Sequence, residues 1–214
     1  MNRRSHFWLV GFLLLPGFGP VLGEDDIETK AKAGDAKAQY EMGTLFFEGR
    51  GVLRDPAKAV EWYRKAADQG FAMAQYRLGD CYAEGTGVAK NSAEAVKWFR
   101  KAAEQGDAKA QCRLGGCYQC GEGVEKDLLQ AVAWYRKASE QGYALAQCDL
   151  GRCFHYGHGV AKDLAEAVKW YRLAADQRDA QAQYSLGLMY AKGEGVEIAG
   201  PDPERIQILD LRHH

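Results

Sequence analysis

Apolar and small residues recur along this chain at helical spacing. Between residues 72 and 83 they stand three and four positions apart, as on one face of a helix, and residues 93–103 repeat that spacing. The glycine-containing segment Gly85-Thr86-Gly87-Val88 separates the two stretches. The pattern therefore predicts a pair of amphipathic helices joined by a glycine turn.

The pattern has a regular period. A motif of the type Asp-Ala-x-Ala-Gln begins at residues 35, 71, 107, 143 and 179, with no insertion between starts. This spacing divides the chain into the units 35–70, 71–106, 107–142, 143–178 and the partial unit 179–196. Repeated helix pairs bury their apolar faces against their neighbours. We therefore expect an all-α protein, an α/α solenoid of about five 36-residue helix–turn–helix repeats.

Polar caps and glycines mark the predicted helix ends. A column of residues able to accept hydrogen bonds from free helix N–H groups precedes the second helices: Asp55, Asn91, Asp127 and Asp163. Positive φ is expected in the turns at Gly49/Gly51, Gly85/Gly87, Gly121/Gly123, Gly157/Gly159 and Gly193/Gly195. Left-handed C-terminal caps are expected at Gly70, Gly106 and Gly142, where the fourth unit has Arg178.

A further glycine column lies inside the predicted first helices: Gly43, Gly79, Gly115, Gly151 and Gly187. Glycine inside a helix costs about 1 kcal/mol relative to alanine. Its repetition predicts close helix–helix contact that leaves no room for a Cβ atom. The Trp-Tyr or Trp-Phe pairs of the second helices recur at one position in each complete unit, which favours core packing over ligand stacking.

The combined motifs are specific to one family. The unit that contains Asp107-Ala-Lys-Ala-Gln111, Leu114-Gly115, Gly121-Glu-Gly123-Val124 and Trp134-Tyr135 resembles the Sel1-like repeat, a relative of the tetratricopeptide repeat. The resemblance covers residues 35–196. It implies a right-handed superhelix whose first helices line the concave face. It also implies a non-enzymatic adaptor that binds a protein or peptide, often outside the cytoplasm, and that needs no cofactor.

The segments flanking the repeats suggest how the stack is covered. Residues 24–34 predict half of a second helix against the first unit. The fifth unit loses its register after Val196, since Ala199 stands where an N-cap residue is expected. Residues 197–214 are interpreted either as a degenerate C-terminal cap that starts near Asp202 or as a tail.

The N-terminal segment 1–23 has the features of a signal peptide. Arg3 and Arg4 precede an apolar run over residues 7–15, and Gly23 offers a cleavage point before Glu24. The run is too short to span a bilayer comfortably, which takes about 20 residues. We expect a cleaved signal and a secreted or periplasmic mature chain without a membrane span. An uncleaved anchor is the alternative.

The composition narrows the class of partner. The 214 residues contain 28 Lys+Arg and 29 Asp+Glu, so the net charge of −1 gives no reason to expect a nucleic-acid partner. In the first helices the least repetitive positions follow i, i+4, i+7 and i+11, which lie on one face. The candidate partner-binding residues of this stripe are Lys37, Glu41, Met73, Arg77, Asp80, Lys109, Arg113, Asp149, Arg152 and Tyr156. A solvated face that is free to vary is the alternative interpretation.

Six cysteines fall within the repeats: Cys81, Cys112, Cys117, Cys120, Cys148 and Cys153. Five replace Leu, Met or Tyr at positions with core character, which favours buried thiols. An even number in a secreted protein allows disulfides instead, namely Cys81–Cys112, Cys117–Cys148 and Cys120–Cys153. The pairing found in cysteine-rich relatives does not carry over, because the second helices contain no cysteine.

Other chemistry has little support in the sequence. A zinc site from Cys117, Cys120, His155 and His158 is the one metal candidate, and no metal is expected. Gly-x-Ser-x-Gly, His-Glu-x-x-His and Ser-x-x-Lys motifs are absent from the chain. The alternatives to the scaffold are a secreted hydrolase of the β-lactamase-like type described for some cysteine-rich relatives, and a Cys/His metal or redox module.

Overall fold

The computed structural model describes residues 24–195, and these form helices and turns alone. The helices are α1 Glu24–Lys32, α2 Ala36–Glu48, α3 Pro56–Asp68, α4 Ala72–Glu84, α5 Ser92–Glu104, α6 Ala108–Cys120, α7 Leu128–Glu140, α8 Ala144–Tyr156, α9 Leu164–Asp176 and α10 Ala180–Lys192. The predicted signal peptide 1–23, the segment 197–214 and Val196 lie outside the described residues.

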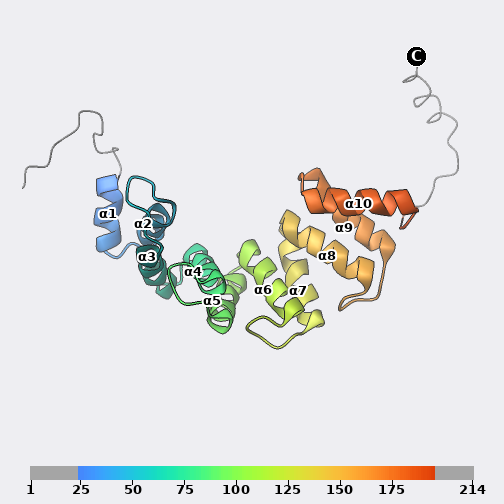
Figure 1. Ribbon diagram of the computed structural model, residues 1–214, viewed down its shortest axis with the longest axis horizontal. Coiled ribbons are helices and arrows are strands. Elements are labelled where there is room, and N and C mark those ends of the chain that lie inside the picture. Colours follow the sequence, from blue (N-terminus) through green and yellow to red (C-terminus); the bar gives the residue numbers. More distant parts are fainter. Residues whose placement is uncertain (1–23, 196–214) are drawn as a thin grey trace, which may run out of the picture.

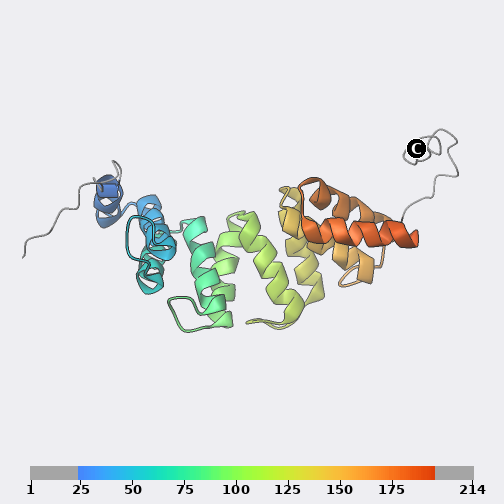
Figure 2. The ribbon, with the colours of Figure 1, turned by 45° about the horizontal axis from the view of Figure 1, so that its top comes forward.

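The helices stack one after another along an open arc (Figure 1). Each packs against its neighbours in the chain, and the pairs α2–α3, α4–α5, α6–α7 and α8–α9 make the most extensive contacts. Figure 2 shows the same succession after rotation, and none of the described helices returns across the stack. The predicted all-α solenoid of repeated helix pairs is confirmed.

Side-chain caps begin the second helices as predicted. The carboxylate or amide oxygens of Asp55, Asn91, Asp127 and Asp163 accept hydrogen bonds from backbone N–H groups in the first turns of α3, α5, α7 and α9. The sequence analysis did not identify a second set of caps, at the first helices. Asp35, Asp107 and Asp179 cap α2, α6 and α10 in the same way.

The turn glycines have the predicted positive φ, between 67° and 75°. From the second unit on, the second glycine of each turn also lies against the preceding unit. A Cβ atom on Gly123 would lie 2.1 Å from the carbonyl oxygen of Ser92, and one on Gly87 would lie 2.2 Å from that of Pro56. Only glycine therefore allows the turn of one unit to rest on the start of the previous second helix.

The glycines inside the first helices allow close packing in four units of the stack. Cβ atoms at positions 43, 79, 115 and 151 would lie 2.5–2.9 Å from the rings of Tyr63, Phe99, Tyr135 and Tyr171. These rings are almost fully buried, and Trp98 and Trp134 beside them are buried too. The predicted core role is confirmed for these residues of the aromatic column, whereas Trp62 and Trp170 are half-buried.

The prediction of close contact is not tested at Gly187. Among the described residues, a Cβ atom there would have no neighbour within 4 Å. In the other units, the second helix of the same unit supplies the aromatic ring that faces the glycine. The described part of the chain ends at residue 195 and includes no second helix of the fifth unit, so close contact at Gly187 stays a prediction.

Buried glutamines connect consecutive units. Gln111 donates from Nε2 to the carbonyl oxygen of Ala103 at 3.1 Å, and its Oε1 accepts from Nε2 of Gln141 at 2.8 Å. Gln39, Gln75 and Gln147 repeat both hydrogen bonds. Each amide therefore ties its first helix to the end of the preceding second helix and to the end of its own unit.

Helix α1 takes the position of a second helix before the first unit. Gln39 Nε2 donates to the carbonyl oxygen of Ala31 at 3.1 Å, as Gln75 does to Ala67. Ala31 is 1% exposed, so α1 covers the end of α2. This packing supports our proposal that residues 24–34 cap the N-terminal end of the stack.

Candidate protein-binding groove

Cavities recur between consecutive first helices. One of about 230 Å³ lies between α2 and α4, one of about 350 Å³ between α4 and α6 with α8 at its edge, and one of about 320 Å³ between α8 and α10. We call the face formed by α2, α4, α6, α8 and α10, onto which these cavities open, the first-helix groove. The cavity between α4 and α6 is the central cavity.

The cavities are built from equivalent positions of the repeat. Phe47, Ala83 and His155 stand at one such position, each on the first helix that precedes its cavity. On the helix that follows, equivalent lining positions hold Asp80, Gly116 and Leu188. The groove is therefore a property of the repeat, and its shape at each junction depends on the residues at these positions.

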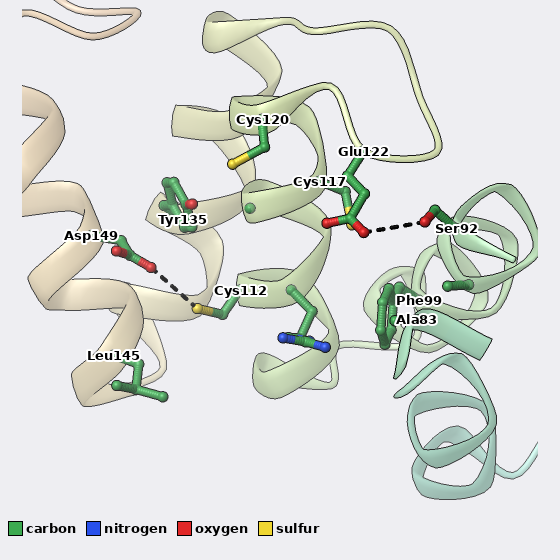
Figure 3. Close-up of a pocket in the computed structure, with 13 residues that line it drawn as sticks. Ala83, Ser92, Phe99, Cys112, Cys117, Cys120, Glu122, Tyr135, Leu145 and Asp149 are labelled. Carbon is green, nitrogen blue, oxygen red and sulfur yellow. Dashed lines mark hydrogen bonds between the residues drawn. The ribbon is translucent and has the colours of Figure 1, made fainter. Parts of the chain in front are cut away.

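Small residues widen the central cavity. Ala83 and Gly116 stand where other junctions have larger side chains, and Phe99 and Leu145 add apolar wall (Figure 3). Cys112, Cys117 and Cys120 line the cavity from α6. The result is a largely apolar recess in the middle of the stack.

The charged groups around the central cavity are paired with one another. Arg113 Nε lies 3.1 Å from Oδ1 of Asp80, which joins α6 to α4. Asp149 Oδ1 lies 2.6 Å from a guanidinium nitrogen of Arg152. Glu122 accepts a hydrogen bond from Ser92 at 3.2 Å (Figure 3) and lies 3.6 Å from Lys90 Nζ. No charge at this cavity is left without a counter-charge.

Burial changes the proton affinity of the acidic groups. Desolvation raises the pKa of Asp149 above 3.8, although Arg152 and a hydrogen bond from Cys112 act in the opposite direction. Desolvation likewise raises the pKa of Asp80, which Tyr76 and Arg113 oppose. Water stabilises the ionised form of both carboxylates only weakly, so their negative charge depends on these neighbouring groups.

The junction between α6 and α8 is bridged by Gln119, at the position that Ala83 occupies one unit earlier. Its Oε1 accepts from the hydroxyl of Tyr135 at 2.7 Å and from a guanidinium nitrogen of Arg152 at 3.4 Å. Gln119 thereby takes up space that is open at the preceding junction.

The cavity between α8 and α10 has a different electrostatic character. His155 Nε2 lies 3.5 Å from Glu194 Oε2, and the His155 ring stacks on Tyr156 with 4.5 Å between centroids. Lys162 and Lys192 also line this cavity. Within residues 24–195, neither lysine has an acidic group at ion-pair distance, so this cavity carries excess positive charge.

The structure distributes the predicted stripe residues among these places. Arg77 and Asp80 line the first cavity, Arg113 and Asp149 the central one, and Tyr156 the last. Arg152 pairs with Asp149. Lys37 and Glu41 form an i,i+4 ion pair at 3.9 Å on α2. Met73 and Lys109 are exposed beside the cavities.

Sequence reasoning missed the residues that shape the central cavity. Ala83, Phe99 and Glu122 line it, yet none belongs to the stripe. A signal was present in the aligned repeats, where this column holds Phe47, Ala83, Gln119, His155 and Ala191. A small residue where the units on either side have large ones indicates local space, which the spacing of variable residues alone does not reveal.

All six cysteines are free thiols in the structure, and Cys81, Cys112, Cys148 and Cys153 are buried. The Cys112 thiol donates to Asp149 Oδ2 at 3.8 Å (Figure 3). Burial raises the pKa of Cys117 and of Cys81 to about 11. Disulfide pairing in an oxidising compartment stays a prediction.

The structure does not assemble the zinc candidate. Across residues 24–195, no three His, Cys, Asp or Glu side chains are grouped so as to hold a metal ion. Cys117 and Cys120 line the central cavity, whereas His155 lines the cavity between α8 and α10.

None of the described helices is long and apolar enough to cross a membrane.

Comparison with known proteins identifies the family to which this repeat architecture belongs. The family profile described as Sel1 repeat matches residues 36–71, 72–107, 108–143, 144–179 and 180–205. The secretory immunoglobulin A-binding protein EsiB of Escherichia coli is 40% identical over 58 residues, which make up 27% of this chain and 12% of EsiB. The chain thus spans only a small part of that curated relative.

Two solved structures are similar over most of the chain. A protective antigen of uropathogenic Escherichia coli with an SLR fold has a TM-score of 0.79 and 40% identity, over 82% of this chain and 38% of that one. A Sel1 repeat protein from Oxalobacter formigenes has a TM-score of 0.73 and 39% identity, over 82% of this chain and 78% of that one.

Proposed function

Because this chain belongs to the Sel1 repeat family, whose members are generally protein-interaction scaffolds, we propose that it is a non-enzymatic adaptor. Its ligand is a protein or peptide, and the first-helix groove is the concave binding face. Its place of action is the periplasm or the extracellular space.

The recurrence of cavities along the groove carries the proposal. Equivalent positions open a cavity at three junctions, between α2 and α4, α4 and α6, and α8 and α10. An extended ligand that crosses successive first helices meets one recess after another, which suits a chain with side chains at regular intervals. The rims carry both acidic and basic groups, which suits a polypeptide better than a polyanion.

The chemistry of the groove supports a binding role over catalysis. A cysteine nucleophile needs a thiolate, but burial raises the pKa of Cys117 to about 11. Asp149, the buried carboxylate at the central cavity, is paired with Arg152. The relative EsiB is named for binding secretory immunoglobulin A, so a protein ligand has a precedent among similar chains.

The proposed location rests on the N-terminal sequence. Arg3, Arg4 and the apolar run over residues 7–15 have the order of a signal peptide. Expression of the full chain in a Gram-negative host tests it. N-terminal sequencing of periplasmic protein is expected to begin near Glu24, whereas an intact Met1 on membrane-bound protein would contradict cleavage.

Site-specific photocrosslinking tests the binding face. Leu145 is 52% exposed and lines the central cavity, while Leu129 is 71% exposed at the start of α7, away from the three cavities. A photoreactive amino acid replaces either leucine in the full chain, expressed in its native compartment. We expect discrete crosslinked protein bands from position 145 and not from 129. Equal crosslinking at both positions, or at 129 alone, would overturn the proposed face.

A further inference from the structure

The cavities of the first-helix groove differ in their chemistry, and this difference describes the ligand. At the central cavity Arg113 is paired with Asp80, Asp149 with Arg152, and Glu122 with Lys90. A charged ligand group there would have to displace an existing partner. An uncharged side chain disturbs none of these pairs, so electrostatics favours an apolar occupant.

The walls of the central cavity agree with an apolar occupant. Ala83, Phe99 and Leu145 present hydrocarbon, and the missing side chain of Gly116 leaves the space open. With a volume of about 350 Å³, the cavity has room for a large side chain such as Phe, Leu or Met. Burial of such a side chain in a recess is the usual form of an affinity hot spot.

The cavity between α8 and α10 requires the opposite chemistry. Lys162 and Lys192 line it, and within the described chain neither has an acidic partner. The carboxylate of Glu194 already faces His155 at 3.5 Å. A ligand carboxylate at this cavity would neutralise lysines that are otherwise unpaired.

The repeat sets the distance between these two sites. They lie two repeats apart. Successive first helices both pack on the second helix between them, so each step is at least the about 8–10 Å of packed helices, and the two sites lie about 20 Å apart or more. An extended chain advances about 3.3 Å per residue, so this distance takes about six residues or more. Gln119 bridges the junction between the two sites, where its Oε1 accepts from Tyr135 and Arg152. The ligand therefore needs no side chain that is bound in a pocket at the junction between α6 and α8.

We propose, on the basis of the proposed function, that the groove recognises an extended peptide with a large apolar residue and an acidic residue at least about six positions apart. The apolar residue occupies the central cavity and the acidic residue binds Lys162 and Lys192. The residues between them cross the junction at Gln119 without a side-chain pocket.

Selection from a displayed library of random linear 12-residue peptides tests this inference on the full chain. We expect enriched peptides to share an apolar and an acidic position separated by about five residues or more. Gly116→Leu fills the central cavity, and a Cβ atom at residue 116 meets only the Tyr135 hydroxyl, at 3.7 Å. We expect this variant to weaken binding of a selected peptide by roughly tenfold or more, and to lose the apolar preference alone.

Ala83→Phe is a second way to fill the cavity, since it copies Phe47 of the first unit. The double variant Lys162→Glu/Lys192→Glu is expected to lose the acidic preference alone. Its matched control is Lys97→Glu/Lys169→Glu, which makes the same change in net charge on the second helices and leaves both preferences intact. Circular dichroism and thermal unfolding confirm that each variant is folded.

The outcomes separate this inference from the proposed function. Enrichment of peptides without the paired pattern, or equal losses in the control, overturns the inference while crosslinking at residue 145 still supports the groove. Absence of any enriched peptide also overturns it, because the inference requires a linear segment. Failure of crosslinking at residue 145 counts against the proposed function itself.

Discussion

Gly115 packs directly against the ring of Tyr135, so that a Cβ atom on this glycine would lie 2.8 Å from Cδ1 of the tyrosine. A Cβ on the adjacent Gly116 would meet only the hydroxyl of the same ring, at 3.7 Å. Two neighbouring glycines of α6 thus have different roles. The first permits the helix contact inside the unit, and the second opens the central cavity.

Alanine substitutions at these two glycines should change the free energy of unfolding in opposite directions. Gly115→Ala forces a methyl group into the Tyr135 ring, and overpacking of this kind costs about 1–3 kcal/mol. Gly116→Ala makes only an ordinary contact with the Tyr135 hydroxyl and gains helix propensity, worth up to about 1 kcal/mol. Urea unfolding of both variants measures this. A loss of stability for Gly116→Ala as large as that for Gly115→Ala would contradict the assignment.

The buried glutamines offer a second test. Gln111→Met removes the donor to Ala103 and the acceptor for Gln141 while keeping the size of the side chain. Leaving a buried carbonyl without its donor costs about 1–3 kcal/mol, so the unfolding midpoint should fall. Gln183→Met is the matched control, because the equivalent Gln183 is exposed while it bonds Ala175. An equal loss in the control would show that burial does not set the cost.

Arg178 is the one non-glycine with positive φ among residues 24–195, at 67°. The left-handed conformation costs an L-residue with a side chain roughly 1–2 kcal/mol. Arg178→Gly should therefore raise the thermal midpoint. Gly142 holds the equivalent place in the third unit with φ 83° and nothing near its missing Cβ, so Gly142→Arg should lower the midpoint by a similar amount. Changes of the same sign in both variants would contradict this account.

The features of this molecule that could be predicted from the sequence are those that recur in every repeat unit. The helix pairs, the caps at Asp55 and Asp163 and the contact at Gly115 were predicted, because each recurs in the printed chain and only one geometry satisfies all copies. The central cavity was missed because it depends on exceptions to the repeat, such as Ala83 and Gly116. The pairing of stripe charges with one another, as in Arg113 with Asp80, was missed as well, because it depends on how side chains of different units meet.

The buried carboxylate Asp149 predicts a pH dependence. Its pKa is raised above 3.8 by burial, so the folded state binds the proton more tightly than the unfolded state does. Because the folded state binds the proton more tightly, folding stability decreases as this group loses its proton. Its contribution to folding stability is largest below pH 3.8 and declines as the pH rises from there through the raised pKa.

Asp149→Asn removes this titration while leaving Arg152 without its carboxylate and Cys112 facing an amide. The difference in unfolding free energy between Asp149→Asn and wild type should therefore shift in favour of the variant as the pH rises from about 4. Equilibrium urea unfolding across acidic pH measures this difference. A difference that is constant with pH, or one that shifts toward wild type, would contradict a raised pKa.

The thiols give the last prediction, which also decides between buried thiols and disulfides. Cys120 is exposed, Cys117 is half-buried, and the other four are buried. Burial raises the pKa of Cys153 to about 11 and that of Cys148 to about 12, so at neutral pH these groups have little thiolate to react. Brief alkylation of native protein followed by peptide mass analysis should therefore label Cys120 first, then Cys117. The remaining thiols should react only after unfolding.

Protein recovered from the periplasm should show six alkylated thiols when denatured without reductant, since Cys112 faces Asp149. Two missing labels and a loss of two hydrogens for each disulfide, mapped to Cys81–Cys112 or Cys117–Cys148, would establish the disulfide alternative instead.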